Sequence, residues 1–208
     1  MLNRLTCTVP LLLLLSAPSW AVVLTFDGDI CTSDPNGGGF AVACLQGTAI
    51  HQSYGDQANV NVSWSHTGGA ESMQWWDSGW IGTTNAAYGR VFVITIIPTA
   101  GYKIQLNSFD LTPYQVTQSY DTLGVVAHIV GTPGFNTGGA TISTLTTTPV
   151  SLTSSAGFDI AVGTSFNIAI DNINFDVVPD NAVPEPATVG IAAAALGLGA
   201  LVARRHRS

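Results

Sequence analysis

Short runs in which apolar and polar residues alternate restrict the fold of this chain more than any other feature. In the run 58–65, Val60, Val62 and Trp64 alternate with asparagine and serine. Because successive side chains of a β-strand point to opposite faces, this period of two places the apolar residues on one face. Comparable runs bounded by Gly, Pro, Asn, Asp and Ser recur through residues 22–180, and no convincing amphipathic helix interrupts them. The sequence therefore predicts an all-β domain over residues 22–180.

The number and spacing of these runs favour two antiparallel sheets. Eight to ten short strands are typical of a sandwich, here of jelly-roll type, and a barrel is the alternative. Residues 91–97 are nearly all apolar, which predicts a strand covered on both faces. The alternation changes phase near Asn107 and Ser108 and again at Asp171 and Asn172, where we expect bulges. Strands are expected at 22–26, 58–65, 91–97, 102–111, 123–130, 140–145, 150–152, 158–162 and 166–178.

Charged residues are few in this domain, and most of them are acidic. Charged residues make up 9% of the chain, and residues 22–183 hold only two basic residues, Arg90 and Lys103, against twelve acidic ones. So few charges exclude a coiled coil and a highly charged disordered chain. A nucleic acid is not expected as a partner, because binding to its phosphates requires Lys and Arg.

The first 21 residues have the pattern of a secretory signal peptide. Arg4 precedes an apolar stretch that includes the leucines at 11–15, and small residues stand at Ser19 and Ala21. This pattern predicts export with cleavage after Ala21. A short membrane anchor is the alternative, but the apolar stretch falls short of the roughly 20 residues that a spanning helix needs.

The C-terminal segment 181–208 contains three successive elements. They are the motif Pro184, Glu185 and Pro186, the mainly apolar run 187–203, and a basic tail with Arg204, Arg205 and Arg207. As a helix, the apolar run would be about 25 Å long, just enough to cross a thin bilayer core. The basic tail would stay in the cytoplasm. We therefore expect a transmembrane helix that holds the exported domain at the inner membrane.

This arrangement resembles the PEP-CTERM sorting signal, and a permanent single-pass anchor is the alternative. The resemblance covers residues 181–208. It implies that an exosortase-type enzyme cleaves near the Pro-Glu-Pro motif, so that the protein resides in the inner membrane only transiently. It also implies a Gram-negative bacterium and a final place at the cell surface or outside the cell, in an exopolysaccharide matrix or biofilm.

Two cysteines, Cys31 and Cys44, remain when Cys7 leaves with the signal peptide. Because export leads to an oxidising compartment, we expect a disulfide between them, and two free thiols are the alternative. The bond would close the Gly-rich loop 32–43 and contribute about 3 kcal/mol by restricting the unfolded chain.

Three tryptophans within six residues, Trp75, Trp76 and Trp80, form the densest aromatic cluster. Aromatic rings stack on the apolar C–H faces of sugars, so the cluster predicts a platform for carbohydrate. The alternative is a place in the core, where Trp is usually buried. Because consecutive strand residues face opposite ways, Trp75 and Trp76 cannot both be core. Polar residues that can meet sugar hydroxyls flank the cluster: Gln74, Asp77 and Asn85.

Acidic residues at the ends of the first and last expected strands indicate a second site. Asp27 follows the first strand, and Asp171 stands beside Asn172 in the last. The run 166–175 resembles the closing strand of jelly-roll carbohydrate-binding modules, which implies that an aspartate helps to hold a structural calcium ion. Calcium takes six to eight oxygen ligands. Solvated turn residues are the alternative, and no other cofactor is expected.

No catalytic motif occurs in the chain. It contains no Gly-x-Ser-x-Gly elbow, no His-Glu-x-x-His and no phosphate-binding glycine loop, and His51, His66 and His128 lie on unrelated segments. We therefore expect a non-enzymatic exported protein that associates with exopolysaccharide. A structural or adhesive protein acting through protein–protein contacts is the alternative, and a polysaccharide hydrolase, for which a motif is missing, is the third.

Overall fold

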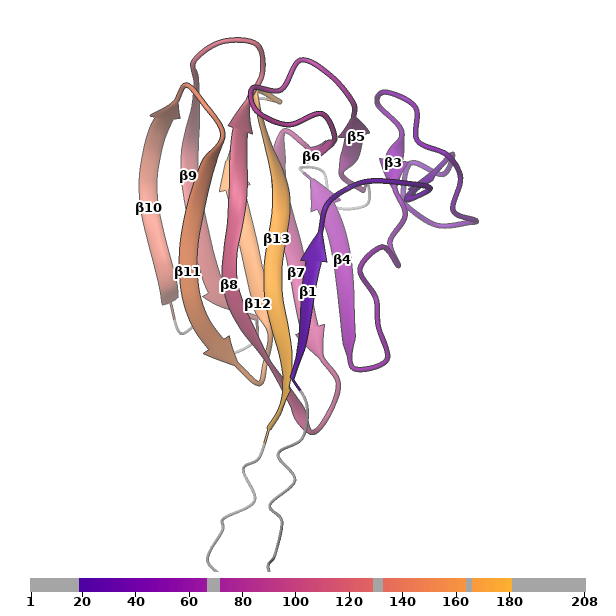
Figure 1. Ribbon diagram of the computed structural model, residues 1–208, viewed down its shortest axis with the longest axis vertical. Helices are drawn as coiled ribbons and strands as arrows, with labels where there is room; N and C mark the ends of the chain where they lie inside the picture. Colours follow the sequence, from indigo (N-terminus) through magenta and orange to yellow (C-terminus); the bar gives the residue numbers. More distant parts are fainter. Residues whose placement is uncertain (1–18, 67–71, 129–132, 164–165, 181–208) are drawn as a thin grey trace, which may run out of the picture.

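The domain is built from two antiparallel β-sheets. The computed structural model describes residues 19–66, 72–128, 133–163 and 166–180, and in these ranges the chain forms thirteen strands and no helix. Figure 1 shows the two sheets lying face to face. The expected all-β domain with two antiparallel sheets, in a sandwich-like arrangement, is confirmed.

We call the larger sheet A and the smaller one sheet B. Sheet A has the spatial order β11 (Thr146–Ser154), β8 (Tyr102–Pro113), β13 (Ile168–Pro179), β6 (Ala86–Tyr88), β5 (Gln74–Trp76), β3 (Ala49–Ile50) and β2 (Cys31–Thr32), with β1 (Trp20–Leu24) also paired to β13. Sheet B has the order β10 (Pro133–Ile142), β9 (Gln118–Ala127), β12 (Phe158–Gly163), β7 (Val91–Pro98) and β4 (Val60–His66).

The main core lies between the sheets and follows the alternation of the sequence. Every second residue of β4, beginning with Val60, is buried, and β7 and β12 repeat the pattern. Each large apolar side chain that is fully buried contributes about 1.5–3 kcal/mol, so this layer supplies the main driving force for folding. The largest fully buried aromatic side chains are Trp64, Phe26, Phe92, Phe109 and Phe175.

Both predicted phase changes occur, and they lie opposite each other in β8 and β13. The pairing of these strands shifts between Asp171 and Phe175, where Asn174 faces Ser108. Asn172 has a positive φ of 49°. The bulge lets Ile170 and Ile173 both point into the core although they are an odd number of residues apart.

The bulge in β13 also separates two neighbours on the same edge of that strand. On one side of it, β1 pairs with Ile173–Val177, and on the other side β6 pairs with Ala169 and Ile170. The first and last strands of the domain are therefore adjacent. The strand β1 includes Trp20 and Ala21, so cleavage after Ala21, which stays a prediction, would leave Val22–Leu24 in the sheet.

The prediction that residues 91–97 are covered on both faces is wrong. In β7, Phe92, Ile94 and Ile96 are buried, but the alternate residues are only partly buried and Val91 is 40% exposed. Apolar side chains are common on open protein surface, so an apolar run does not require a cover on each side.

No helix within the described ranges is long and apolar enough to cross a membrane. The expected transmembrane helix at 187–203, the Pro-Glu-Pro motif, the basic tail and most of the signal segment lie outside the described residues.

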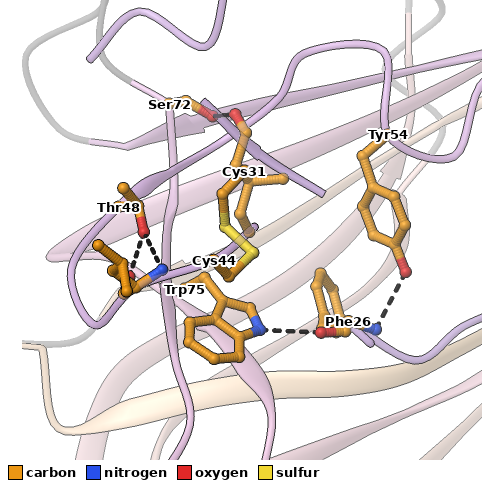
Figure 2. Close-up of a disulfide and its surroundings, with 9 residues drawn as sticks. Phe26, Cys31, Cys44, Thr48, Tyr54, Ser72 and Trp75 are labelled. Atoms are coloured by element: carbon orange, nitrogen blue, oxygen red, sulfur yellow. Dashed lines mark hydrogen bonds between the residues drawn. A yellow bond between two sulfur atoms is a disulfide. The ribbon is translucent and has the colours of Figure 1, made fainter. Parts of the chain in front are cut away.

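The expected disulfide between Cys31 and Cys44 is present, with the two Cα atoms 5.0 Å apart. Cys31 is fully buried and belongs to the main core. Figure 2 shows the bond beside Trp75, Thr48 and Ser72. It closes the loop between β2 and β3, and so supports the part of sheet A in which the strands are only two or three residues long.

Candidate functional site

Trp75 belongs to the main core. It lies in β5, is 8% exposed, and its indole Nε1 donates to the carbonyl oxygen of Phe26 over 2.8 Å. The N–H of Phe26 donates to the hydroxyl oxygen of Tyr54 over 3.0 Å (Figure 2). Because Phe26 has a positive φ of 57° just after β1, no strand partner satisfies its backbone groups, and these two side chains do so instead. Trp75 therefore fixes a turn and does not join the other two tryptophans.

A second aromatic cluster lies on the face of sheet A opposite the main core. In β6, Ala87 faces the main core and the next residue, Tyr88, faces the opposite side of the sheet. In β13, Ile170 faces the main core and the preceding residue, Ala169, faces the opposite side. Alternation in β5 likewise sends Trp76 away from Trp75. The second cluster consists of Trp80, Ala86, Tyr88 and Ala169, with Trp76 and Tyr114 packed against it.

The segment between β5 and β6 folds back to bring Trp80 to this cluster. Trp80 forms an isolated bridge with Tyr114, just after β8. Gly79 has a φ of +84°, and a Cβ atom there would come within 2.5 Å of the Tyr114 ring. Glycine is needed at this position both for its conformation and for the close approach of the ring. The side chain of Thr112 donates to the carbonyl oxygen of Ile81 over 2.8 Å, which holds the returning segment on the sheet.

The rings surround a hollow of about 260 Å³, which we call the aromatic hollow. Trp80 is 7% exposed, and its ring centroid lies 5.1 Å from that of Tyr114 and 5.7 Å from that of Tyr88. The indole Nε1 of Trp80 is buried and has no acceptor within the described part of the chain. Phe166 is 42% exposed, and Trp76 and Tyr114 are partly exposed. The hollow is lined by Trp76, Trp80, Tyr88, Tyr114, Phe166 and Asn167.

Only one of the three flanking polar residues reaches this cluster. The hydroxyl of Tyr88 donates to Oε1 of Gln74 over 2.7 Å. Asp77 is exposed and accepts a hydrogen bond from Gln46; this bond and one from Ser78 lower the pKa of its carboxyl. Asn85 donates instead to Asp27. Gln74 therefore contacts the hollow only through its bond to Tyr88, and none of the three flanking residues lines the hollow itself.

Asp171 and Asp110 form an acidic pair at the bulge of β13. They face each other in the register of β13 and β8. Asp171 accepts from the hydroxyl of Thr83 over 2.6 Å and from the N–H of Asn172 over 2.7 Å. Asp110 accepts from the hydroxyl of Thr147 over 2.6 Å and from Nδ2 of Asn172 over 2.9 Å. Each carboxylate is thus held by neutral donors, with no cation among these partners.

Burial raises the pKa of the Asp171 carboxyl above its ordinary value. The hydrogen bonds from Thr83 and Asn172 counteract part of this rise, and the negative charges of Asp110 and Asp27 add to it. Thr83 donates to Asp171 and Asn85 donates to Asp27, so the segment before β6 contacts both carboxylates. Among the described residues, no group of three or more His, Cys, Asp or Glu side chains is arranged to hold a metal ion. A calcium ion at Asp27 and Asp171 stays a prediction.

The three histidines have separate local roles. Nδ1 of His51 lies 2.7 Å from the hydroxyl oxygen of Ser53 in the same turn, and its Nε2 lies 2.8 Å from the carbonyl oxygen of Gly39. His128 lies 3.0 Å from the carboxylate of Asp159. His66 ends β4, with its ring centroid 6.3 Å from that of Phe166. The contact between Ser53 and His51 is local, because the two residues are two positions apart in the chain, and neither residue lines the aromatic hollow.

Tyr114 and Phe166 are members of the aromatic hollow that sequence reasoning did not identify. Tyr114 follows β8 and Phe166 precedes β13, so neither lies near the tryptophans in the chain. Only their pairing partners bring them there: Tyr114 through its bridge to Trp80, and Phe166 through β13, which pairs with β6. The phase change of residues 166–178 is the one signal that marks this strand as irregular.

Comparison with known protein families gives a match for the C-terminal segment of the chain. Residues 182–208 match the PEP-CTERM protein-sorting motif, which confirms the predicted sorting signal. No curated protein and no solved structure matches the chain. The motif implies export and membrane-anchored sorting in a Gram-negative bacterium, with processing by an exosortase-type enzyme. The chain thus ends in the PEP-CTERM motif that marks proteins for this route.

Proposed function

We propose that this protein is a non-enzymatic protein of the cell surface or extracellular matrix that associates with exopolysaccharide. The observation that carries the proposal is the aromatic hollow, where Trp76, Tyr114 and Phe166 stand partly exposed around the buried ring of Trp80. Rings fixed by their neighbours offer flat apolar surfaces to the C–H faces of sugars. The sorting motif fits this role because it directs the domain out of the cell.

The positions of the two chain ends support display of the hollow away from the membrane. Trp20, at the start of β1, pairs with Val177 near the end of β13, so both ends leave the sandwich at the same side. Figure 1 shows β3, β5 and β6 toward the opposite end of the sheets. While the C-terminal segment holds the domain at the membrane, the hollow would therefore face outward.

The strand order supports a jelly roll, which we propose as the finer description of the fold. Sheet A contains the order β1-β13-β8-β11, and sheet B contains β7-β12-β9-β10. From β7 to β13 the chain changes sheet at every connection except that between β9 and β10. Nested crossings of this kind are typical of double-sheet jelly rolls, which include lectin domains. The fold alone does not establish a function, so the proposal depends on the hollow.

Binding to polysaccharides tests the proposal directly. In affinity electrophoresis against a panel of soluble polysaccharides, Trp76→Ala and Tyr114→Ala should each weaken retention about tenfold, because each removes a stacking surface. Phe40→Ala is the matched control, since Phe40 is 90% exposed and does not line the hollow. Equal retention of the wild-type protein and a Trp76→Ala, Tyr114→Ala double variant would refute sugar binding at this site.

The mass of the protein isolated from cells tests the route. We expect a mature chain that starts at Val22 and lacks the basic tail with Arg204, Arg205 and Arg207. A stable product with an intact C-terminus as the sole form would support a permanent anchor instead.

A protein–protein role is the second candidate, and one observation favours it. Three large apolar side chains are exposed around the disulfide-closed loop: Phe40 is 90%, Leu45 73% and Val42 42% exposed. Such residues are suited to contact with another protein. Self-association in the absence of sugar, removed by Phe40→Ser and Leu45→Ser, would favour this role over the first.

A structural calcium ion between Asp27 and Asp171 is a further proposal. Thr83 donates to Asp171 and Asn85 donates to Asp27, so one short segment contacts both carboxylates, and no Lys or Arg is among these partners. Addition of calcium after chelation should raise the melting temperature of the wild-type protein but leave that of Asp171→Asn unchanged. An unchanged melting temperature in the wild-type protein would show that the carboxylates are ordinary turn residues.

A further inference from the structure

Tyr88, which lines the aromatic hollow, belongs to a row of paired residues that crosses sheet A. The register places one residue from each strand in this row, on the same face as Tyr88. Since neighbouring strands lie about 4.8 Å apart, the distance from β2 to β6 along the row is roughly 14 Å. The row consists of Thr32, Ala49, Gln74, Tyr88, Ala169 and Thr112, each paired with the next.

A second hollow lies over the β2 side of this row. Its volume is about 200 Å³, and we call it the polar hollow. Hydroxyl and amide groups dominate its lining, among them those of Thr32, Ser33, Thr48, Ser72 and Gln74. The disulfide of Cys31 holds this region together, because Cys31 precedes Thr32 in β2.

The two hollows adjoin each other at three points. Gln74 lines the polar hollow and accepts the hydrogen bond of Tyr88, which lines the aromatic one. Gly47, also in the polar hollow, lies so close to Trp76 that a Cβ atom on it would be 3.9 Å from the ring. The third point is the edge contact of His66 with Phe166. The short strands thus carry an aromatic surface and a polar surface side by side.

We infer that the two hollows form one groove that holds a neutral polysaccharide along its chain, with one sugar on the aromatic rings and the next units in the polar hollow. This inference rests on the proposed function and specifies its ligand. Sugars combine apolar C–H faces with many hydroxyls, which matches the two kinds of lining. Oε1 of Gln74 takes the bond from Tyr88, and Nε2 donates to no acceptor among the described residues, so Nε2 is available to a sugar hydroxyl at the junction.

Charge decides between classes of polysaccharide. Neither hollow is lined by Lys or Arg, and residues 22–183 hold two basic residues against twelve acidic ones. Uronate or sulfate groups would find no Lys or Arg to pair with in either lining, where His66 is the one basic side chain, and would be repelled by the domain as a whole. A groove of this charge therefore selects uncharged chains over acidic ones.

Titration calorimetry with neutral oligosaccharides of two to six units tests this inference. The probes are β-1,4-linked and β-1,3-linked gluco-oligosaccharides, with oligouronates of equal length for comparison. Affinity of the wild-type protein should rise at least about tenfold from two to six units of the better neutral series, and oligouronates should bind more weakly. Trp76→Ala should weaken binding at every length.

Two variants locate the polar part of the groove. Gln74→Ala should lower the affinity for six units about three- to tenfold and leave that for two units nearly unchanged, as expected for the loss of one hydrogen bond. Tyr88→Phe breaks the same Gln74–Tyr88 bond but keeps the amide of Gln74. Its affinity should therefore still rise from two to six sugar units, as in the wild-type protein. Melting temperatures of both variants check that each is folded.

The outcomes separate the inference from the proposed function. Binding that is equally tight at two and six units, or an equal effect of Gln74→Ala and Tyr88→Phe, overturns the groove and leaves sugar binding at the aromatic hollow intact. Tighter binding of oligouronates overturns the assignment to neutral chains. No binding of any probe overturns the groove and the proposed function together.

Discussion

Trp75 and Trp76 are consecutive residues, but they belong to two regions with different physical demands. Trp75 fills the main core and satisfies the backbone of Phe26 through its indole nitrogen. Trp76 packs against the second aromatic cluster and is partly exposed on the opposite face of the sheet. The comparison shows that tryptophans adjacent in sequence need not share one function. Strand geometry sends one side chain into the core, where it stabilises the fold, and the next to the surface, where it is available for binding.

Replacement of Trp75 by alanine should separate the two regions most clearly. The change leaves a cavity in the main core and removes the donor to Phe26, so we expect a loss of about 3–5 kcal/mol in the free energy of unfolding. Trp76→Ala is the matched control and should cost about 1 kcal/mol or less. Urea denaturation measures both. Equal losses would contradict the division into a structural and a surface tryptophan.

Removal of the disulfide is expected to have the next largest effect. Cys31 and Cys44 are 13 residues apart, and a loop of this length corresponds to about 3 kcal/mol of chain entropy. The Cys31→Ser, Cys44→Ser variant should therefore unfold at lower urea concentration than the wild-type protein. Since Trp80 and Tyr114 are held by other contacts, the near-UV circular dichroism of their cluster should persist below the transition. Its complete loss in the folded variant would show that the two regions are not independent.

The sequence predicts the fold where many residues repeat one signal. The long strands β4, β8 and β13 each carry several alternating apolar positions, and the phase changes in β8 and β13 reveal their bulges. The strands β2 and β3 have two residues each, which is too few for any period to be recognised. Their existence depends on pairing with distant segments, and this information is not local.

The candidate site was predicted only in part for the same reason. Alternation separates Trp75 from Trp76 without knowledge of the fold. By contrast, the return of Trp80 onto Tyr114 and the turn of Asn85 toward Asp27 depend on long-range packing. Proximity in sequence therefore does not determine which residues share a surface, and partners far away in sequence leave no local signal.

The conservative change Trp75→Phe refines the first prediction. It keeps most of the aromatic volume in the core but leaves the carbonyl oxygen of Phe26 without the indole donor. An unsatisfied buried acceptor costs about 1–3 kcal/mol, so the variant should be less stable than wild type but more stable than Trp75→Ala. Tyr88→Phe, in the second cluster, breaks a bond to a partly exposed partner and should cost less. Chemical denaturation of the three variants gives the order, and a fully stable Trp75→Phe would show that the ring alone matters.

The smallest expected effect concerns Asp171, which lies where β13 passes from β1 to β6. Burial raises the pKa of its carboxyl, so the folded protein binds this proton more tightly than the unfolded chain. The contribution of Asp171 to stability is therefore greatest below the ordinary Asp pKa of about 4 and declines as the pH rises through the raised value. Asp171→Asn removes this decline. In calcium-free buffer, its stability relative to wild type should increase above about pH 4 and then level off.

The gain at neutral pH should be at most about 1 kcal/mol, because the amide retains one acceptor oxygen for Thr83 or Asn172 and loses the other. Urea denaturation of both proteins across this pH range measures the difference. Thr83→Val is a useful control, since it removes a hydrogen bond that lowers the pKa of Asp171 and should make the decline steeper. A stability difference between Asp171→Asn and wild type that does not change with pH would mean that the carboxyl titrates alike in the folded and unfolded chain. The hydrogen bonds of the bulge would then offset the burial of Asp171 fully, and the acidic pair would not make stability depend on pH.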